Sequence, residues 1–117
     1  MRDDQERLRD ILQSINDVQT FVSGMTRPRF RKIETDDRKT YRAICDCIST
    51  LGEAVKHLPL EITSKNEKID WMGHAGMKDI VTHQYFRVQL DLVWNTIKRD
   101  LPDLKAFAEA ELGSIIR

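Results

Sequence analysis

The sequence lacks an excess of charge of either sign. Its 117 residues include 19 lysines and arginines and 19 aspartates and glutamates, so the formal net charge is zero at pH 7 with neutral histidines. A balanced chain does not attract nucleic acid or an anionic membrane through its overall charge. Any contact with such a partner must therefore come from a local patch of basic residues.

The sequence also lacks a long apolar run. A helix that spans a bilayer needs about 20 consecutive apolar residues, and no segment approaches that length. The first seven residues are mostly charged or polar, which is not typical of a signal peptide. We therefore expect a cytoplasmic protein that has no membrane segment.

Cysteine is scarce as well, since Cys45 and Cys47 are the only two. Two positions apart on a helix, they would point about 200° away from each other and should not form a disulfide. No matching pair of histidines or cysteines follows, so a metal site built on them is a poor alternative. We expect two reduced thiols, with Cys45 in the core, and neither a metal nor another cofactor.

What the chain has in abundance is apolar residues at helical spacing. Such stripes cover residues 8–25, 41–58 and 90–97, a shorter helix is expected from Asp70 to His83, and a final helical piece extends to about Gly113. No segment with the alternating period of a strand competes with them. The pattern predicts an all-α, antiparallel bundle of four to five helices in one domain, residues 1–117.

Prolines and capping residues predict where the helices end. Thr35 or Asp36 is the expected N-cap of the second helix, and Pro59 is its expected stop. Pro102 fits poorly inside a helix, so we expect a kink or break around Arg99–Leu101. The linkers 26–34 and 61–68 are expected to be irregular.

Residues 27–32 form the one local basic cluster, with four cations around Phe30. Such a cluster could contact phosphates. The favoured alternative is a solvated loop in which Phe30 is tucked beneath the chain as a plug.

A second cluster lies in residues 77–86, where Lys78, His83 and Tyr85 provide a cation, an imidazole and a phenol within eight positions. An imidazole with a cationic neighbour and no metal-ligand partners indicates acid–base chemistry on a phosphate ester rather than metal chemistry. Glu53 lies one position off the apolar stripe of the second helix, where a solvated carboxylate is the default interpretation. His57 is expected to interact with the end of that helix, and His74 is assigned no chemistry.

The chain resembles the HepT-like branch of the HEPN superfamily. That family's motif is an arginine, usually followed by Asn or Asp, and then a His-x-Tyr sequence after four to six residues. Asp79, His83 and Tyr85 match this motif, whereas Lys78 stands where the family has arginine. The segments that carry the resemblance are Leu-Gly-Glu-Ala at 51–54, Trp71, the run from Gly76 to Phe86, and Leu-Val-Trp at 92–94.

The resemblance implies a helical bundle that forms a homodimer, with two copies of the motif around a shared cleft. It further implies a metal-independent endoribonuclease that cleaves RNA and acts as the toxin of a type VII toxin–antitoxin system. The implied partner is an MntA-type nucleotidyltransferase antitoxin, which silences the toxin by adding AMP to the motif tyrosine, here Tyr85. Without the resemblance, Tyr85 would be interpreted as a core aromatic residue with its hydroxyl at the rim.

The roles that follow are His83 as the acid or base, Lys78 as the phosphate-binding cation, and Asp79 as polar support. Glu53 is a candidate for hydrogen bonding to the motif. On an ideal helix, however, Lys78 and His83 are separated by about 140° and about 7.5 Å along the axis. Either the helix ends before His83, or a second subunit completes the site.

Lysine in place of arginine leaves two outcomes open. Arginine holds a phosphate with a planar fork of two hydrogen bonds, whereas lysine offers a compact point charge. The protein is then either an active nuclease with a weaker grip or a catalytically weakened binding module that the nucleotidyltransferase still modifies. A third, weaker hypothesis is a nucleotide-binding regulatory bundle.

Overall fold

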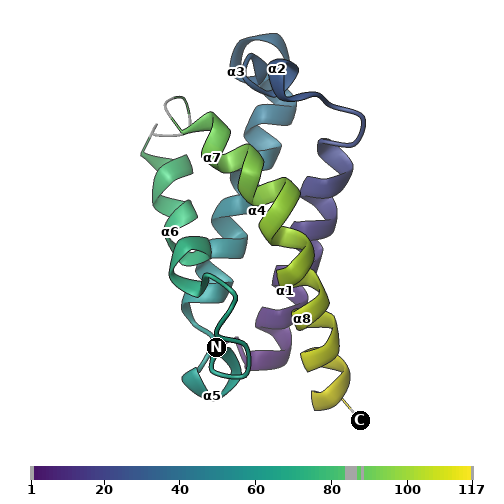
Figure 1. Ribbon diagram of the computed structural model, residues 1–117, viewed down its shortest axis with the longest axis vertical. Helices are drawn as coiled ribbons and strands as arrows, with labels where there is room; N and C mark the ends of the chain where they lie inside the picture. Colours follow the sequence, from purple (N-terminus) through teal and green to yellow (C-terminus); the bar gives the residue numbers. More distant parts are fainter. Residues whose placement is uncertain (1, 84–86, 88, 117) are drawn as a thin grey trace.

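The computed structural model of the protein describes residues 2–83, 87 and 89–116, and within these ranges it contains helices and no strand. Four long helical segments run alternately up and down the molecule (Figure 1). The prediction of an all-α antiparallel bundle is confirmed. The segments are α1 (Asp4–Phe21), α4 (Arg38–Lys56), α6 (Trp71–Thr82) and the consecutive α7 (Leu90–Asn95), η2 (Thr96–Asp100) and α8 (Leu101–Ile115).

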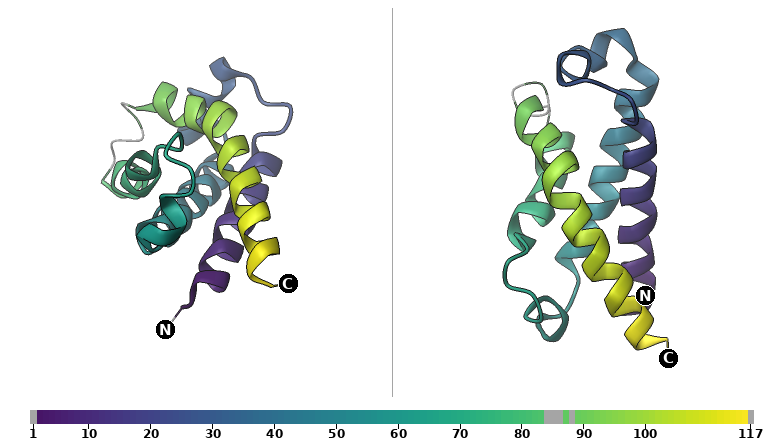
Figure 2. Two further views of the ribbon diagram at one scale, coloured as in Figure 1. Left: turned by 60° about the horizontal axis from the view of Figure 1, so that its bottom comes forward. Right: turned by 45° about the vertical axis from the view of Figure 1, so that its right-hand side comes forward.

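α4 lies at the centre of this arrangement and packs mainly against α6 on one side and α1 on the other, while α8 packs on α1 (Figure 2). The apolar stripes of these helices meet in one core, where burial of each large side chain stabilises the fold by about 1.5–3 kcal/mol. None of the helices in the described part of the chain is long and apolar enough to cross a membrane. Fully buried core residues include Leu8, Ile11, Ile15, Ile44, Val93 and Leu104.

Aspartate side chains cap three of the long helices. The carboxylate of Asp3 accepts a hydrogen bond from the Glu6 N–H at 2.8 Å, and Asp70 accepts one from the Gly73 N–H at 3.0 Å. The N-cap of α4 is Asp37, so the prediction of Thr35 or Asp36 was wrong. The reason is that residues 33–36 form a helical turn of their own, which leaves Asp37 as the residue with non-helical backbone angles.

The two linkers that were expected to be irregular contain short helices, which corrects that prediction. They are α2 (Arg27–Phe30), α3 (Ile33–Asp36) and α5 (Leu60–Thr63). The Thr26 side chain accepts a hydrogen bond from the Arg29 N–H, and Pro28 occupies the first turn of α2. The predicted plug is confirmed, since Phe30 is fully buried and its ring lies 5.0 Å from that of Trp94.

The two cysteines are both free thiols, as predicted, but their burial is the reverse of the prediction. Cys47 is buried, while Cys45 is only half-buried. Positions 44, 47/48 and 51 follow the helical period, so Cys47 shares the buried face with Ile44 and Leu51. Burial also raises the pKa of the Cys47 thiol to about 11, which makes it a poor nucleophile at neutral pH.

Around Arg99–Leu101, where a kink or a break was expected, the helix does not break but continues from α7 through η2 into α8. η2 is a π-helical turn, which is wider than an α-helical one. A proline has no N–H and its ring collides with the carbonyl four residues earlier in a regular helix. The wider turn changes the register just before Pro102, so that the α-helix resumes with the proline in its first turn.

Candidate functional site

Lys78 and Glu53 form an ion pair that joins α6 to α4. Lys78 Nζ donates a hydrogen bond to Glu53 Oε2 at 2.8 Å, and both side chains are about two-fifths exposed. The other carboxylate oxygen, Glu53 Oε1, lies 2.8 Å from Nε2 of His57, the C-cap residue of α4. Glu53 therefore contacts the motif through Lys78, which is the contact that the hypothesis about Glu53 requires.

These contacts keep both members of the pair charged. The hydrogen bonds from Lys78 and then from His57 lower the pKa of Glu53 to about 2. The same contact raises the pKa of Lys78 above its ordinary value. At neutral pH the lysine is therefore a fixed ammonium group held by a carboxylate.

Gly52 explains why α6 can lie so close to α4 at this point. A Cβ atom at position 52 would lie 3.1 Å from Lys78 Cβ and 3.2 Å from each of the carbonyl oxygens of His74 and Ala75. The absence of a side chain lets the two helices approach, which places the Lys78 stem directly beside α4. The Gly-Glu pair at positions 52 and 53 thus provides both the space and the partner for Lys78.

His83 lies at the C-terminal end of α6. It is the C-cap residue, and its backbone N–H donates to the carbonyl oxygen of Asp79 at 3.0 Å. Its side chain is 64% exposed, and Nε2 is 3.9 Å from Asp79 Oδ1. The imidazole is therefore on the surface rather than deep inside the bundle.

The predicted site residues thus fall into two adjacent pairs, Lys78 with Glu53 and His83 with Asp79. α6 ends at Thr82, so one of the two predicted alternatives, a helix that ends before His83, is met. The two pairs nevertheless make separate contacts within one chain. Tyr85 lies outside the described residues.

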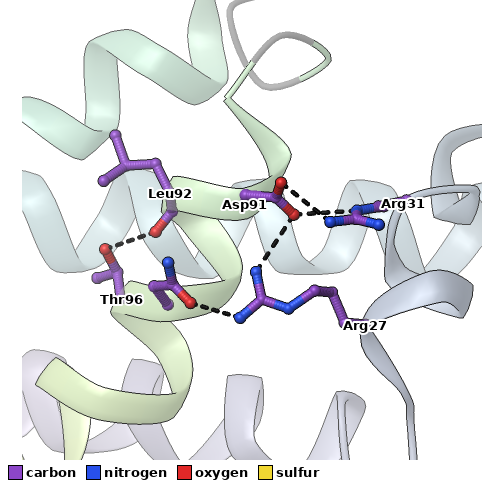
Figure 3. A network of polar contacts seen from close by, with 6 residues as sticks. Arg27, Arg31, Asp91, Leu92 and Thr96 are labelled. Atoms are coloured by element: carbon purple, nitrogen blue, oxygen red, sulfur yellow. Dashed lines mark hydrogen bonds and ion pairs between the residues drawn. The ribbon is translucent and has the colours of Figure 1, made fainter.

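The basic linker is tied to α7 by ion pairs (Figure 3). Arg31 donates from Nε and Nη2 to the two oxygens of Asp91 at 3.0 and 3.1 Å. Arg27 reaches Asp91 Oδ1 at 3.3 Å and Asn95 Oδ1 at 2.7 Å. Arg31, and to a lesser extent Arg27, lowers the pKa of Asp91. This arrangement favours the structural interpretation of the basic cluster.

Arg87, which lies after the motif in the chain, forms a further ion pair that ties it to α3. Its Nε donates to Glu34 Oε2 at 3.2 Å, and its Nη2 also contacts the same carboxylate. Arg87, two residues after the His-x-Tyr sequence, is therefore anchored to α3. Through Arg87 and Asp91, the segment after the motif is attached to the two short helices at one end of the bundle.

Sequence reasoning missed two features near the site. The first is His74, which is buried and whose Nδ1 has no hydrogen-bond partner among the described residues. It borders two cavities, of about 550 and 290 Å³, between α6 and the η2–α8 segment. Burial lowers its pKa. No signal along the chain indicates this burial, because it depends on how α6 meets another helix.

The second feature is a hollow of about 290 Å³ on the surface beside Lys78. Residues of α1 form part of its wall, including Arg7, although α1 is far from the motif in sequence. A surface arginine on an amphipathic helix has no pattern that would single it out. Within residues 2–83, 87 and 89–116, no three histidine, cysteine or acidic side chains are grouped so that they could hold a metal ion.

Comparison with known proteins agrees with the helical fold and with the motif residues at the end of α6. Residues 11–111 match the family described as "Ribonuclease HepT-like", and the chain belongs to this family. It thus combines the helical bundle with a lysine in place of the arginine of the motif.

Individual relatives cover most of the chain. A protein of Thermococcus cleftensis named "Probable ribonuclease HepT" is 31% identical over 104 residues, which is 89% of this chain and 91% of the relative. A protein of Methanocaldococcus jannaschii is 33% identical over 103 residues (87% and 82%), and one of Caldanaerobacter subterraneus is 36% identical over 98 residues (84% of each). Both of the latter carry names that mark them as provisional RNases. No solved structure matches the chain.

Proposed function

We propose that this protein is a metal-independent endoribonuclease that acts as the toxin of a type VII toxin–antitoxin pair. The observation that carries the proposal is the exposed imidazole of His83 at the end of α6, five residues after an ammonium group that Glu53 holds in place. Membership of the HepT-like ribonuclease family supports the same activity. The RNase names of the relatives add to this support.

The proposed reaction needs three groups around one phosphodiester. A base removes the proton of the 2′-hydroxyl, and the 2′-oxygen attacks phosphorus to form a cyclic 2′,3′-phosphate. The bond from phosphorus to the 5′-oxygen breaks, and an acid donates a proton to that leaving oxygen. His83 serves as acid or base, Lys78 stabilises the charge on the phosphate oxygens, and Asp79 orients the imidazole from 3.9 Å.

We propose that the active form is a homodimer. One exposed His83 per chain cannot serve as base and acid at the same moment, whereas a two-fold axis near the end of α6 would supply two imidazoles. Within one chain, Lys78 and His83 make separate contacts. This supports a dimer, because the second subunit can supply the catalytic groups that one chain does not bring together.

The test is cleavage of single-stranded RNA by the His83→Ala variant in the presence of EDTA. Removing a general acid or base lowers rates by about 10²–10⁴-fold, so we expect at least a 100-fold loss of activity and loss of growth inhibition. Glu109 on α8 is exposed and forms no ion pair or side-chain hydrogen bond among the described residues, so Glu109→Ala is the matched control with unchanged activity. Full cleavage by His83→Ala would rule out the proposed chemistry.

A second candidate function is a binding module that an MntA-type nucleotidyltransferase modifies. Two observations favour it: lysine replaces the motif arginine, and Lys78 already donates a hydrogen bond to Glu53. In both candidates, AMP is transferred from ATP to the hydroxyl of Tyr85, and pyrophosphate leaves.

Intact-mass measurement after incubation with ATP and the nucleotidyltransferase separates the two candidates. Added AMP on a wild-type protein that also cleaves RNA supports the toxin. Added AMP on a protein that cleaves no RNA supports the binding module. Tyr85→Phe is the control, and an unchanged level of modification in this variant would contradict the assignment of Tyr85.

A further inference from the structure

The hollow beside Lys78 brings residues of three helices together. α1 contributes Arg7 and Asp10, and Arg2 lies just before this helix. α4 contributes hydroxyl groups and Glu53, and α6 contributes Lys78. Its volume of about 290 Å³ is near the lower end of the range for small-ligand pockets. The complete lining is Arg2, Arg7, Asp10, Ser49, Thr50, Glu53, Ala54 and Lys78.

Two of the three cationic side chains in this hollow form ion pairs, and the third does not. Arg2 is engaged with Asp10 at 2.6 Å and with Glu6 at 3.1 Å, and Lys78 is engaged with Glu53. The guanidinium of Arg7 forms no ion pair and no side-chain hydrogen bond among the described residues. One cation therefore remains without a counter-ion next to the lysine of the motif.

We propose that Arg7 and Lys78 together bind a backbone phosphate of the RNA in this hollow. The inference rests on the proposed ribonuclease function and adds a phosphate subsite to it. Arg7 supplies the planar fork that can donate two parallel hydrogen bonds to a phosphate, which Lys78 cannot supply. Hydroxyl groups of Ser49 and Thr50 line the same hollow and can donate further hydrogen bonds.

The carboxylates of the hollow do not prevent this binding, because each is already matched by a cation. Asp10 is paired with Arg2, and Glu53 is held by Lys78 and His57. A phosphate that enters the hollow meets the unmatched charge of Arg7 first. The ammonium of Lys78 can contact the phosphate while it keeps its bond to Glu53, since an ammonium group has three donors.

The phosphate that Arg7 binds is a neighbour of the scissile one, and the ammonium of Lys78, which has three donors, contacts both phosphates. His83 does not line the hollow, and it follows Lys78 by five residues, or about 7.5 Å along a helix axis. Lys78 and Glu53 are the residues that the hollow shares with the candidate site. An RNA strand that crosses this surface would place one phosphate against Arg7 and an adjacent one near His83.

The experiment measures binding of a fluorescent single-stranded RNA by anisotropy over a series of salt concentrations. All proteins carry His83→Ala so that the RNA stays intact. We expect Arg7→Ala to weaken binding about five- to tenfold and to reduce the salt slope by about 0.7, the value for one phosphate contact on a single strand. Arg9→Ala is the matched control, because Arg9 is on the same helix, is exposed, and forms no ion pair or side-chain hydrogen bond among the described residues.

A second variant, Arg7→Lys, separates the fork from the charge. We expect it to keep the salt slope but to bind more weakly than the parent, since the point charge remains and the paired hydrogen bonds are lost. Equal affinities and slopes for Arg7→Ala and Arg9→Ala would overturn the subsite alone, provided that the parent binds RNA. If the parent binds no RNA and the wild type cleaves none, the proposed function fails and the subsite fails with it.

Discussion

At the scale of single residues, His74 and His83 show how differently one helix can present the same side chain. His83 is 64% exposed at the end of α6, whereas His74 is 3% exposed and its Nδ1 has no hydrogen-bond partner among the residues that the structure describes. Burial lowers the pKa of His74, while the carboxylates of Asp100 and Asp70 partly oppose this effect. Lys68 and Asp103 also line the cavity that His74 borders.

This environment predicts a loss of stability in mild acid. The unfolded chain takes up a proton at His74 below pH of about 6.5, but the folded chain resists protonation because its pKa is lower. The free energy of unfolding should therefore fall as the pH decreases from 7.5 to 5.5, and the His74→Gln variant should lack this part of the decrease.

Urea denaturation at several pH values measures this effect. His57→Gln, which changes a histidine that is 45% exposed, is the control and should keep the decrease. The carboxylate of Glu53 titrates well below this pH window, so it does not contribute. An identical pH dependence in His74→Gln and the wild type would contradict the prediction.

At the scale of elements, the contact between α4 and α6 positions the candidate site. It combines the close approach at Gly52 with the ion pair of Lys78 and Glu53. A substitution at Gly52 would therefore disturb packing and the orientation of the motif lysine together.

We expect Gly52→Ala to lower the free energy of unfolding by about 1–3 kcal/mol, because overpacking forces helices apart. Two of the three atoms closest to the new methyl group belong to the backbone of α6, which cannot rotate away. Gly113→Ala is the matched control. A Cβ there has no atom within 4 Å, so that change should stabilise the protein by up to about 1 kcal/mol through helix propensity.

Chemical denaturation measures both variants, and RNA cleavage by Gly52→Ala reports on the site. A Gly52→Ala protein that is as stable and active as the wild type would show that the spacing of α4 and α6 is not important. A smaller effect on stability together with a clear loss of cleavage would indicate that the substitution acts mainly by displacing Lys78.

At the scale of the whole molecule, α7 lies toward the opposite end of the bundle from α5 (Figure 1). Exposed apolar side chains occur at both ends, since Leu92 on α7 is 45% exposed and Leu60 on α5 is 79% exposed. A dimer that brings two copies of His83 together must bury surface near α7 rather than near α5.

If the proposed homodimer forms through this surface, Leu92→Arg should convert it to a monomer and abolish RNA cleavage. Leu60→Arg is the matched control and should remain dimeric and active. Light scattering after size-exclusion chromatography measures the mass of each variant. A wild-type protein that cleaves RNA as a monomer, or a Leu92→Arg protein that stays dimeric and active, would contradict this assignment.

Much of the fold was predictable because it depends on local patterns. The apolar stripes predicted all four long helical segments, and Asp70 was recognised as the start of α6. The errors had several sources. Residues 33–36 form a helical turn instead of a cap, the linkers contain short helices, and Cys47 rather than Cys45 faces the core.

The sequence by itself determined the helical segments and most of their core-facing residues, because helical periodicity needs only the order of residues along the chain. It also determined the spacing from Lys78 to His83. It did not identify Cys47 or His74 as buried. The tertiary structure decided which groups meet: Lys78 with Glu53, 25 residues away, and the hollow that adds Arg7 from another helix. Such contacts depend on how rigid helices pack against one another, and that information is absent from any single segment.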